Sequence, residues 1–348
     1  MMTNSSHGLE DSVTIASGRL RDVEVTVFSV MRDELFFLPA FFDHYRRLQV
    51  EQFIVLDDGS TDGTTEFLAA QPDCVLTTSP ISFGETVHFA DGTKHKAGLL
   101  LKRALPSKFL QNKYAIYADA DEFLLLPRDL RSVQHLFEIL RDHDIDAVAA
   151  SLVEFYPETL KSMREPLKPL RIEDLFSAYP FFDGHPLLAL RSGEWPTEVG
   201  QSTTARLFRK HKIDHVPWYL QWLSQTMSDR LFGKRMTGGV MKTPVARWSS
   251  RVYLNNSHET SVPPTDQLLL AVAHFKFTYD LFRRVDRSMV LRSHAGQSRK
   301  YFQYDRLLSS NSSDDRVLTA PHTRRFNSID DLKASGLLFS KLLVTVDL

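Results

Sequence analysis

The sequence of 348 residues has little cysteine and almost no net charge. Its single cysteine, Cys74, excludes an internal disulfide framework, and we interpret it as a small buried hydrophobe because no partner histidine for a nucleophile is recognisable. Lysine and arginine number 42 against 43 acidic residues, so the overall charge favours neither a nucleic-acid partner nor a membrane surface.

Long hydrophobic runs are also missing. No apolar run reaches the roughly 18 residues of a membrane span, and no basic-then-apolar signal pattern opens the chain. We therefore expect a soluble, cytoplasmic protein without a membrane span, which can still dock peripherally at the inner face of the cell membrane.

Short apolar runs alternate with amphipathic stretches between residues 23 and 155. Apolar, β-branched runs predict strands at 23–30, 53–56, 74–78 and 147–155, and a further strand that begins at 114. Apolar residues spaced by three and four predict helices at 35–48, 65–70, 97–105 and 133–141. Strands that alternate with helices are typical of βαβ units. The sequence therefore predicts a Rossmann-like α/β fold, with a mainly parallel sheet that helices cover on both faces.

Three carboxylates, those of Asp119, Asp121 and Glu122, follow the predicted strand that begins at 114. Like charges this close repel one another and lose hydration, so a cation, hydrogen bonds or open solvent must compensate them. A divalent metal ion suits the pattern, because hard cations bind one or two carboxylates and take water and phosphate oxygens as further ligands. At the end of a strand, residues Asp119 and Asp121 point to the same side. The motif therefore predicts a metal site.

A second acidic motif, Asp57-Asp58-Gly59-Ser60, follows the predicted strand 53–56. A carboxylate there can accept a hydrogen bond from a ribose hydroxyl or a base N–H, and the glycine lets the backbone approach closely. Ordinary turn chemistry is the alternative interpretation. Because ligands of such sheets bind outside the carboxyl ends of the strands, we expect the two acidic motifs to face one crevice.

Together these stretches resemble glycosyltransferase family 2 and its relatives, which have a GT-A fold. The resemblance covers residues 23 to about 155 and is closest to a bacterial branch with a similar D-x-D-E-F motif. It rests on the run Val25 to Val30 with Arg32, Asp33 and Glu34 behind it, on Asp57 to Thr64, on Lys96 to Arg103, and on Tyr117 to Phe123.

The resemblance implies transfer of a sugar, with inversion, from a nucleoside-diphosphate sugar, in the first place a UDP-sugar, to a hydroxyl of a glycan or lipid-linked acceptor. Such enzymes act in the synthesis of surface polysaccharides and glycoconjugates. The implied cofactor is Mn²⁺ or Mg²⁺, held by Asp119 and Asp121. The residues that the resemblance assigns to nucleotide binding are Val30, Arg32, Asp57, Asp58, Lys96, Arg103 and Asp119. Solvated surface charges are the alternative interpretation of Lys96 and Arg103.

Beyond residue 155 the resemblance weakens. We expect a mobile tail at 1–22, a nucleotide-sugar-binding half at 23–155, an acceptor-binding part at 156–280 and a C-terminal helical segment at 281–348. Within the acceptor-binding part, the residues 203–209 and 211–216 predict a short hairpin. A helix predicted at 281–291 carries Arg283, Arg284 and Arg287, which form either a solvated basic face or a site for a diphosphate or an anionic acceptor.

His274 resembles a late histidine that related enzymes supply as a further metal ligand, and a buried strand histidine bonded to the backbone is the alternative. The reaction also needs a base that deprotonates the acceptor hydroxyl. Candidate carboxylates are Asp183, Glu194 and Glu198.

Two other functions fit a sheet with paired carboxylates. A nucleotidyltransferase usually has a Gly-rich, basic loop after the first strand, whereas Met31-Arg32-Asp33-Glu34 contains no glycine. A non-catalytic carbohydrate-binding or scaffold protein with a GT-A fold would be free to lose its acidic motifs, and both are intact here.

Overall fold

The structure is a computed structural model that describes residues 9–89, 91–213, 238–291, 299–309 and 316–342. Most of its strands join one ten-stranded sheet in the order β1-β4-β3-β2-β7-β13-β9-β14-β16, with β8 paired to β14. These strands are β1 (Thr14–Ser17), β2 (Thr26–Met31), β3 (Gln52–Asp57), β4 (Cys74–Thr78), β7 (Lys113–Tyr117), β8 (Glu122–Leu125), β9 (Ala147–Glu154), β13 (Met241–Trp248), β14 (Leu268–His274) and β16 (Phe339–Ser340).

The directions of the strands follow from their pairings. Strands β4, β3, β2, β7, β9 and β14 run one way, and β1, β13, β8 and β16 run the other way. The predicted α/β class with a mostly parallel sheet is confirmed.

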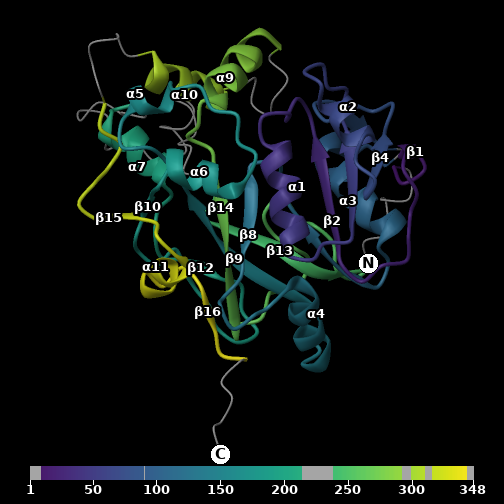
Figure 1. The fold of residues 1–348 in the computed structure, drawn as a ribbon. Helices are drawn as coiled ribbons and strands as arrows, with labels where there is room; N and C mark the ends of the chain where they lie inside the picture. The colour runs from purple at the N-terminus through teal and green to yellow at the C-terminus, as the bar shows by residue number, and fades with distance from the viewer. Residues whose placement is uncertain (1–8, 90, 214–237, 292–298, 310–315, 343–348) are drawn as a thin grey trace, which may run out of the picture.

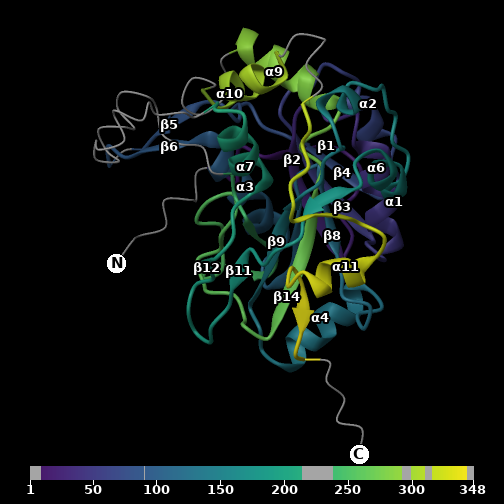
Figure 2. The ribbon, with the colours of Figure 1, turned by 90° about the vertical axis from the view of Figure 1, so that its left-hand side faces the viewer.

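Helices cover both faces of the sheet. Figure 2 shows α3 on one side of the strands and α1 and α6 on the other. The helices are α1 (Leu38–Arg47), α2 (Thr64–Ala69), α3 (Ala97–Phe109), α4 (Val133–Asp142), α5 (Leu160–Met163), α6 (Ile172–Ala178), α7 (Thr203–Lys210), α9 (Asp280–Leu291), α10 (Arg299–Leu308) and α11 (Ile329–Ala334). Helix α1 buries Phe41, Phe42 and Tyr45, whose spacing puts them on one face.

Three two-stranded ribbons complete the described strands: β5 (Thr86–His88) with β6 (Lys94–Lys96), β10 (Phe181–Asp183) with β15 (Thr323–Arg325), and β11 (Leu188–Ala189) with β12 (Thr197–Glu198). The ribbon β5–β6 projects from the body of the molecule (Figure 2). None of the helices in the described residues has the length and hydrophobicity that a membrane crossing requires.

Two expectations about local structure are wrong. Residues 203–210 form helix α7, not the first arm of a hairpin, because Ser202 caps the helix by accepting from the Ala205 N–H and because Leu207 and Phe208 are buried on one face. The remainder of that predicted hairpin lies partly in residues 214–237, outside the described part of the chain.

The mobile tail expected at 1–22 contains a strand, since β1 pairs with β4 and the side chains of Leu9 and Val13 are buried. The residues between these anchors are polar, which is why composition alone indicated a tail. Residues 1–8 lie outside the described part.

The segment 156–280 supplies two strands to the centre of the main sheet. Strand β13 lies between β7 and β9, and β14 lies beside β9. Strand β14 also pairs with β8 in a register that places His274 opposite Glu122. The late part of the chain thereby reaches the acidic residues that follow β7.

Candidate functional site

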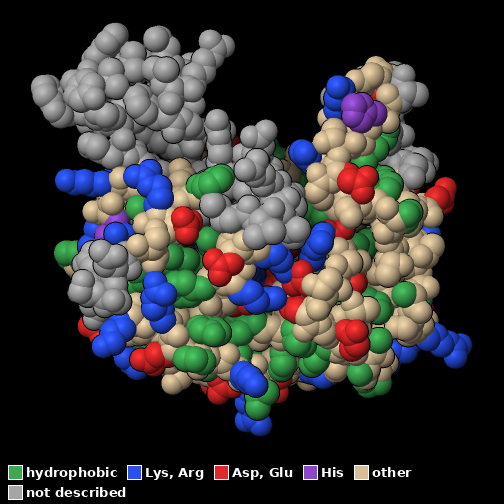
Figure 3. Space-filling view, turned by 90° about the horizontal axis from the view of Figure 1, so that it is seen from above, with side chains coloured by type: hydrophobic (Ala, Val, Ile, Leu, Met, Phe, Trp, Pro, Cys, Tyr) green, Lys and Arg blue, Asp and Glu red, His purple; other side chains and the backbone are tan. Residues whose placement is uncertain are grey.

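Both acidic motifs border one cavity of about 310 Å³ at the carboxyl ends of β3 and β7. Figure 3 looks onto this end of the molecule, where basic and acidic side chains gather around a hollow. Helix α9 lies at the top of the molecule (Figure 1), and its residues Arg284 and Arg287 line the same cavity. The side chains that line the cavity include Val30, Arg32, Glu34, Asp58, Phe83, Lys102, Asp119, Asp121, Glu122, His258, His274, Lys276, Arg284, Arg287 and Tyr304.

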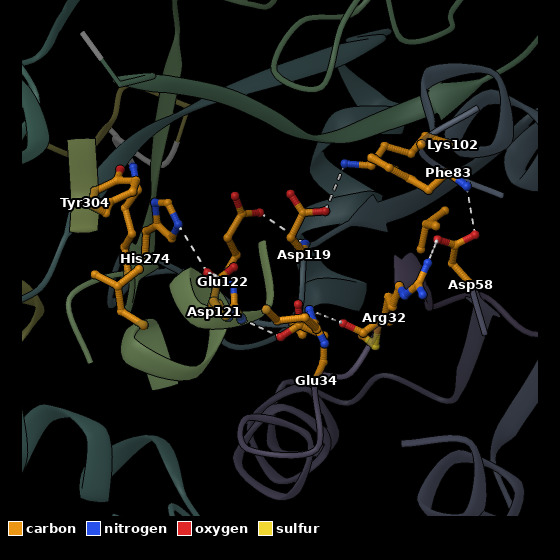
Figure 4. A pocket seen from close by; sticks show the side chains of 18 of the residues that line it. Arg32, Glu34, Asp58, Phe83, Lys102, Asp119, Asp121, Glu122, His274 and Tyr304 are labelled. Atoms are coloured by element: carbon orange, nitrogen blue, oxygen red, sulfur yellow. Dashed lines mark hydrogen bonds and ion pairs between the residues drawn. The ribbon is translucent and has the colours of Figure 1, made fainter. Parts of the chain in front are cut away.

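The carboxylates of the acidic turn, residues 119–122, lie in the middle of the cavity, with Lys102, Phe83 and Asp58 on one side and His274 and Tyr304 on the other (Figure 4). Asp119 accepts hydrogen bonds from Lys102 Nζ at 3.1 Å and from Lys242 Nζ at 3.2 Å. Burial opposes ionisation, but these two cations hold the pKa of Asp119 below its ordinary value.

Asp121 and Glu122 have different partners. The Asp121 carboxylate lies 3.4 Å from His274 Nε2 and 3.2 Å from the Arg284 guanidinium, and Glu122 forms a close ion pair with Lys242. Burial alone would raise the pKa of Asp121. The nearby Arg284 and His274 have the stronger effect, so the pKa of Asp121 lies below its ordinary value. The negative charge of the turn is thus compensated by lysine and arginine from α3, β13 and α9.

Helix α1 holds the acidic turn from below. His44 Nε2 lies 2.8 Å from the Leu124 carbonyl, and the Tyr45 hydroxyl donates to the Glu122 carbonyl at 3.1 Å while it accepts from the Leu124 N–H at 3.2 Å. Burial lowers the pKa of His44 to about 4, so its ring is neutral at pH 7 and donates through Nε2 to the carbonyl. Two side chains of one helix therefore fix the strand β8.

The two carboxylates of the second acidic motif, Asp57 and Asp58, have different roles. Asp57 accepts hydrogen bonds from Ser60 and from the Thr65 hydroxyl at 2.9 Å, so its carboxylate closes the turn. Asp58 lines the cavity, accepts from the Phe83 N–H at 2.8 Å and lies 3.4 Å from the Arg32 guanidinium. The turn interpretation holds for Asp57, and only Asp58 has the position expected of a residue that contacts a ligand.

The three arginines of α9 are paired, so the interpretation as a solvated basic face is wrong. Arg283 contacts Asp62 at 3.0 Å, Arg284 joins Glu34 to Asp121, and Arg287 pairs with Asp33. These ion pairs bind α9 to the loops that follow β2 and β3. The cavity is thereby closed on one side by residues that are far away in sequence.

Burial gives one carboxyl near these arginines an unusual pKa. In Glu34, burial raises the pKa to about 8 although the Arg284 guanidinium lowers it. The Glu34 carboxyl, which lines the cavity next to Arg284, is therefore harder to ionise than an exposed glutamate.

Two basic residues assigned by the resemblance lie elsewhere. Lys96 is exposed on β6 and donates to the Thr86 hydroxyl at 3.0 Å, and Arg103 donates to the Leu254 carbonyl. Lys102 lines the cavity instead. Lys102 lies four residues after the buried Gly98, on the same side of helix α3. Its position in the apolar stripe of this helix is the sequence signal that distinguishes it from Lys96 and Arg103.

The three candidate bases are also outside the residues that line the cavity in the described part of the chain. Asp183 is buried elsewhere and accepts from Arg206 at 2.7 Å and from Tyr156 at 2.6 Å. Glu194 lies near Arg191, 3.8 Å away on the surface, and Glu198 is exposed on β12.

The donor atoms of Asp119 and Asp121 fit Mg²⁺ or Mn²⁺, which need only one or two protein carboxylates when phosphate oxygens and water complete the shell. His274, expected as a further ligand, lies beside Asp121, and its Nδ1 atom is buried without a hydrogen-bond partner among the described residues. Within the described residues, no group of three or more His, Cys, Asp or Glu side chains is arranged to hold a metal ion.

Comparisons with known protein families and curated sequences identify no relative of this chain. No model of a known protein family matches the chain, and no curated protein sequence matches it. The geometry and chemistry of the cavity therefore indicate the function.

Proposed function

We propose that the protein is a metal-dependent glycosyltransferase with a GT-A fold, which moves a sugar from a nucleoside-diphosphate sugar to a hydroxyl acceptor. The observation that carries this proposal is that Asp58 and the acidic turn 119–122, which follow two different strands, border the same cavity. Ligands of open α/β sheets bind at this edge of the sheet.

The side of the cavity with Asp58 suits the nucleoside. The Phe83 N–H and Arg32 hold one carboxylate in place, and a carboxylate accepts hydrogen bonds from ribose hydroxyls or base N–H groups. Val30 and Phe83 supply apolar surface next to it. A flat, partly apolar nucleoside with hydroxyl donors matches both features.

The basic side chains suit the diphosphate. Lys102, Arg284 and Arg287 line the cavity next to the acidic turn, and charge-assisted hydrogen bonds from lysine and arginine to phosphate are among the strong ones. Mn²⁺ or Mg²⁺ bound by Asp119 and Asp121 would supply further positive charge to the leaving diphosphate. The remaining space would receive the sugar and the hydroxyl of a glycan or lipid-linked acceptor, with inversion at the anomeric carbon if the transfer is a single displacement.

Titration calorimetry with a panel of UDP-, dTDP- and GDP-sugars, with Mn²⁺ and with EDTA, tests the proposal. We expect one class of donor, in the first place UDP-sugars, to bind in the presence of Mn²⁺ and to be hydrolysed or transferred slowly. Failure of every nucleotide sugar to bind would end the proposal.

The same samples separate the rival functions. Binding of a nucleoside triphosphate and a sugar phosphate, with release of pyrophosphate, would identify a nucleotidyltransferase. Binding of glycans without any turnover of nucleotide sugars would identify a carbohydrate-binding protein.

A further inference from the structure

The charged groups of the cavity are engaged with one another. A general base must offer a lone pair to the acceptor hydroxyl, and a carboxylate that takes a proton gives up its ion pair. Asp58 lies 3.4 Å from Arg32, Asp119 lies 3.1 Å from Lys102, and Asp121 lies 3.2 Å from Arg284. Glu34 is also paired with Arg284, and burial raises its pKa, which favours the protonated form. None of these carboxylates is therefore well suited to accept a proton from the acceptor hydroxyl.

His258 differs from them. Its Nδ1 atom lies 3.0 Å from the Met241 carbonyl oxygen, which can only accept, so Nδ1 carries the proton. Burial, with Lys242 nearby, lowers the pKa of His258 to about 4, so the ring is neutral at pH 7. The Nε2 atom therefore bears a lone pair. Because the Nδ1 edge faces β13 and the residue lines the cavity, the Nε2 edge is the one that a ligand can reach.

The backbone holds the His258 ring in this orientation. The His258 carbonyl accepts from the Thr243 N–H at 2.8 Å, and its own N–H donates to Asn256 Oδ1 at 2.7 Å. A Cβ atom at Gly239 would lie 2.8 Å from the ring, so the absence of a side chain there lets the imidazole pack against the backbone. The lone pair is thus presented from a fixed position.

The other histidine of the cavity offers no such atom. His274 directs Nε2 to Asp121, and its Nδ1 atom is buried from solvent. A hydroxyl that enters the cavity can therefore reach a basic nitrogen of His258 but not one of His274.

We propose that His258 is the general base of the transfer, an inference that rests on the proposed function. Its Nε2 takes the proton of the acceptor hydroxyl while the hydroxyl oxygen forms a bond to the anomeric carbon. The bond from that carbon to the diphosphate oxygen breaks, and its electron pair leaves with the nucleoside diphosphate. The imidazolium then returns the proton to water.

Two measurements on the full chain test this role. First, His258→Gln should lower the turnover of the bound nucleotide sugar, with water or an acceptor, about 10²- to 10⁴-fold, while calorimetry shows donor affinity within about twofold of wild type. His274→Gln is the comparison variant in the same cavity. Turnover by His258→Gln within about threefold of wild type would overturn the inference.

Second, diethyl pyrocarbonate, which acylates unprotonated imidazole nitrogens, should modify His258 in the folded protein, as read by peptide mass mapping. The exposed His143 should react as well, and the buried His44 should not. A bound nucleotide sugar should protect His258 and not His143. An unmodified His258 would overturn the inference even if no donor turns over, whereas a reactive His258 in a protein that binds no nucleotide sugar would reject the proposed function alone.

Discussion

The acidic turn and the surroundings of Asp183 are both clusters of buried charge, and they differ in what the charge faces. Asp183 accepts from Arg206, Tyr156 and the Thr203 hydroxyl, at 2.7, 2.6 and 3.1 Å, and its side chain is 4% exposed. Asp119 is also paired with cations, yet its side chain is 32% exposed towards the cavity. Burial and ion pairing are therefore common to structural and functional carboxylates. What sets the acidic turn apart is the open space beside it.

The largest effect should come from breaking the closed cluster. Asp183→Ala leaves the buried Arg206 without its carboxylate partner, and such a loss costs about 3 to 5 kcal/mol of unfolding free energy. Urea unfolding measures this, with the exposed Glu194→Ala as a control expected within about 0.5 kcal/mol of wild type. A stable Asp183→Ala variant that no longer turns over its donor would instead restore Asp183 as the base.

A substitution in the acidic turn should instead lower activity and leave the fold intact. Asp121→Ala removes a proposed ligand of the metal ion that would stabilise the leaving diphosphate, and we expect turnover of the nucleotide sugar to fall about 10²- to 10³-fold, as when one electrostatic contribution to the transition state is lost. The fold should survive, because Arg284 keeps its ion pairs with Glu34 and Asp280. Turnover against Mn²⁺ concentration and the thermal midpoint are the readouts, and unchanged metal dependence would remove Asp121 from the metal site.

A smaller effect should distinguish Asp57 from Asp58, the two carboxylates of the second acidic motif. Asp58→Ala should weaken nucleotide binding by about 1 to 3 kcal/mol with little change in stability. Asp57→Ala should do the reverse, because its carboxylate bonds Ser60 and Thr65 within the turn. Calorimetry measures the nucleotide affinity of both variants, and thermal unfolding measures their stability. Equal losses of nucleotide affinity would contradict the different roles of Asp57 and Asp58.

The last effect appears only on acidification and concerns the support of the acidic turn by His44. The folded pKa of about 4 lies below the ordinary value of 6.5, so the neutral form stabilises the fold. This contribution is complete above pH 6.5 and is lost as the pH falls from 6.5 to about 4, at no more than about 1.4 kcal/mol per pH unit. In His44→Gln this slope should be absent from urea unfolding between pH 7 and 4. An identical slope would assign the acid sensitivity to another group.

Sequence patterns predicted the local elements of the first half well. The strand at 74–78 has the predicted bounds, and α1 and α4 lie within a few residues of their predicted ranges. Periodicity and strand-end motifs are local signals, so they also located Asp58 and the acidic turn. The beginning of the chain was the exception, since the pairing of β1 with β4 depends on few apolar residues.

The partners of the acidic turn could not be predicted in the same way. Lys242 is separated from Asp119 by 123 positions, and Arg284 is separated from Asp121 by 163 positions. Spacing carries no information over such distances, and only the pairing of β14 with β8 and the insertion of β13 bring these residues together. The same reason explains why sequence patterns indicate Asp183, Glu194 and Glu198 as candidate bases and do not indicate His258.

The position of β13 has a consequence for synthesis of the chain. Strand β9 pairs with β13 and β14, and both emerge after it. Until residue 248 has left the ribosome, the apolar strand Ala147–Glu154 has neither of its neighbours and presents two free edges. Late, non-local pairing of this kind is slow and leaves the nascent chain open to aggregation. Fragments that end before β13 should therefore need chaperones to stay dispersed, whereas the neighbouring strands β2, β3, β4 and β7 can already pair among themselves.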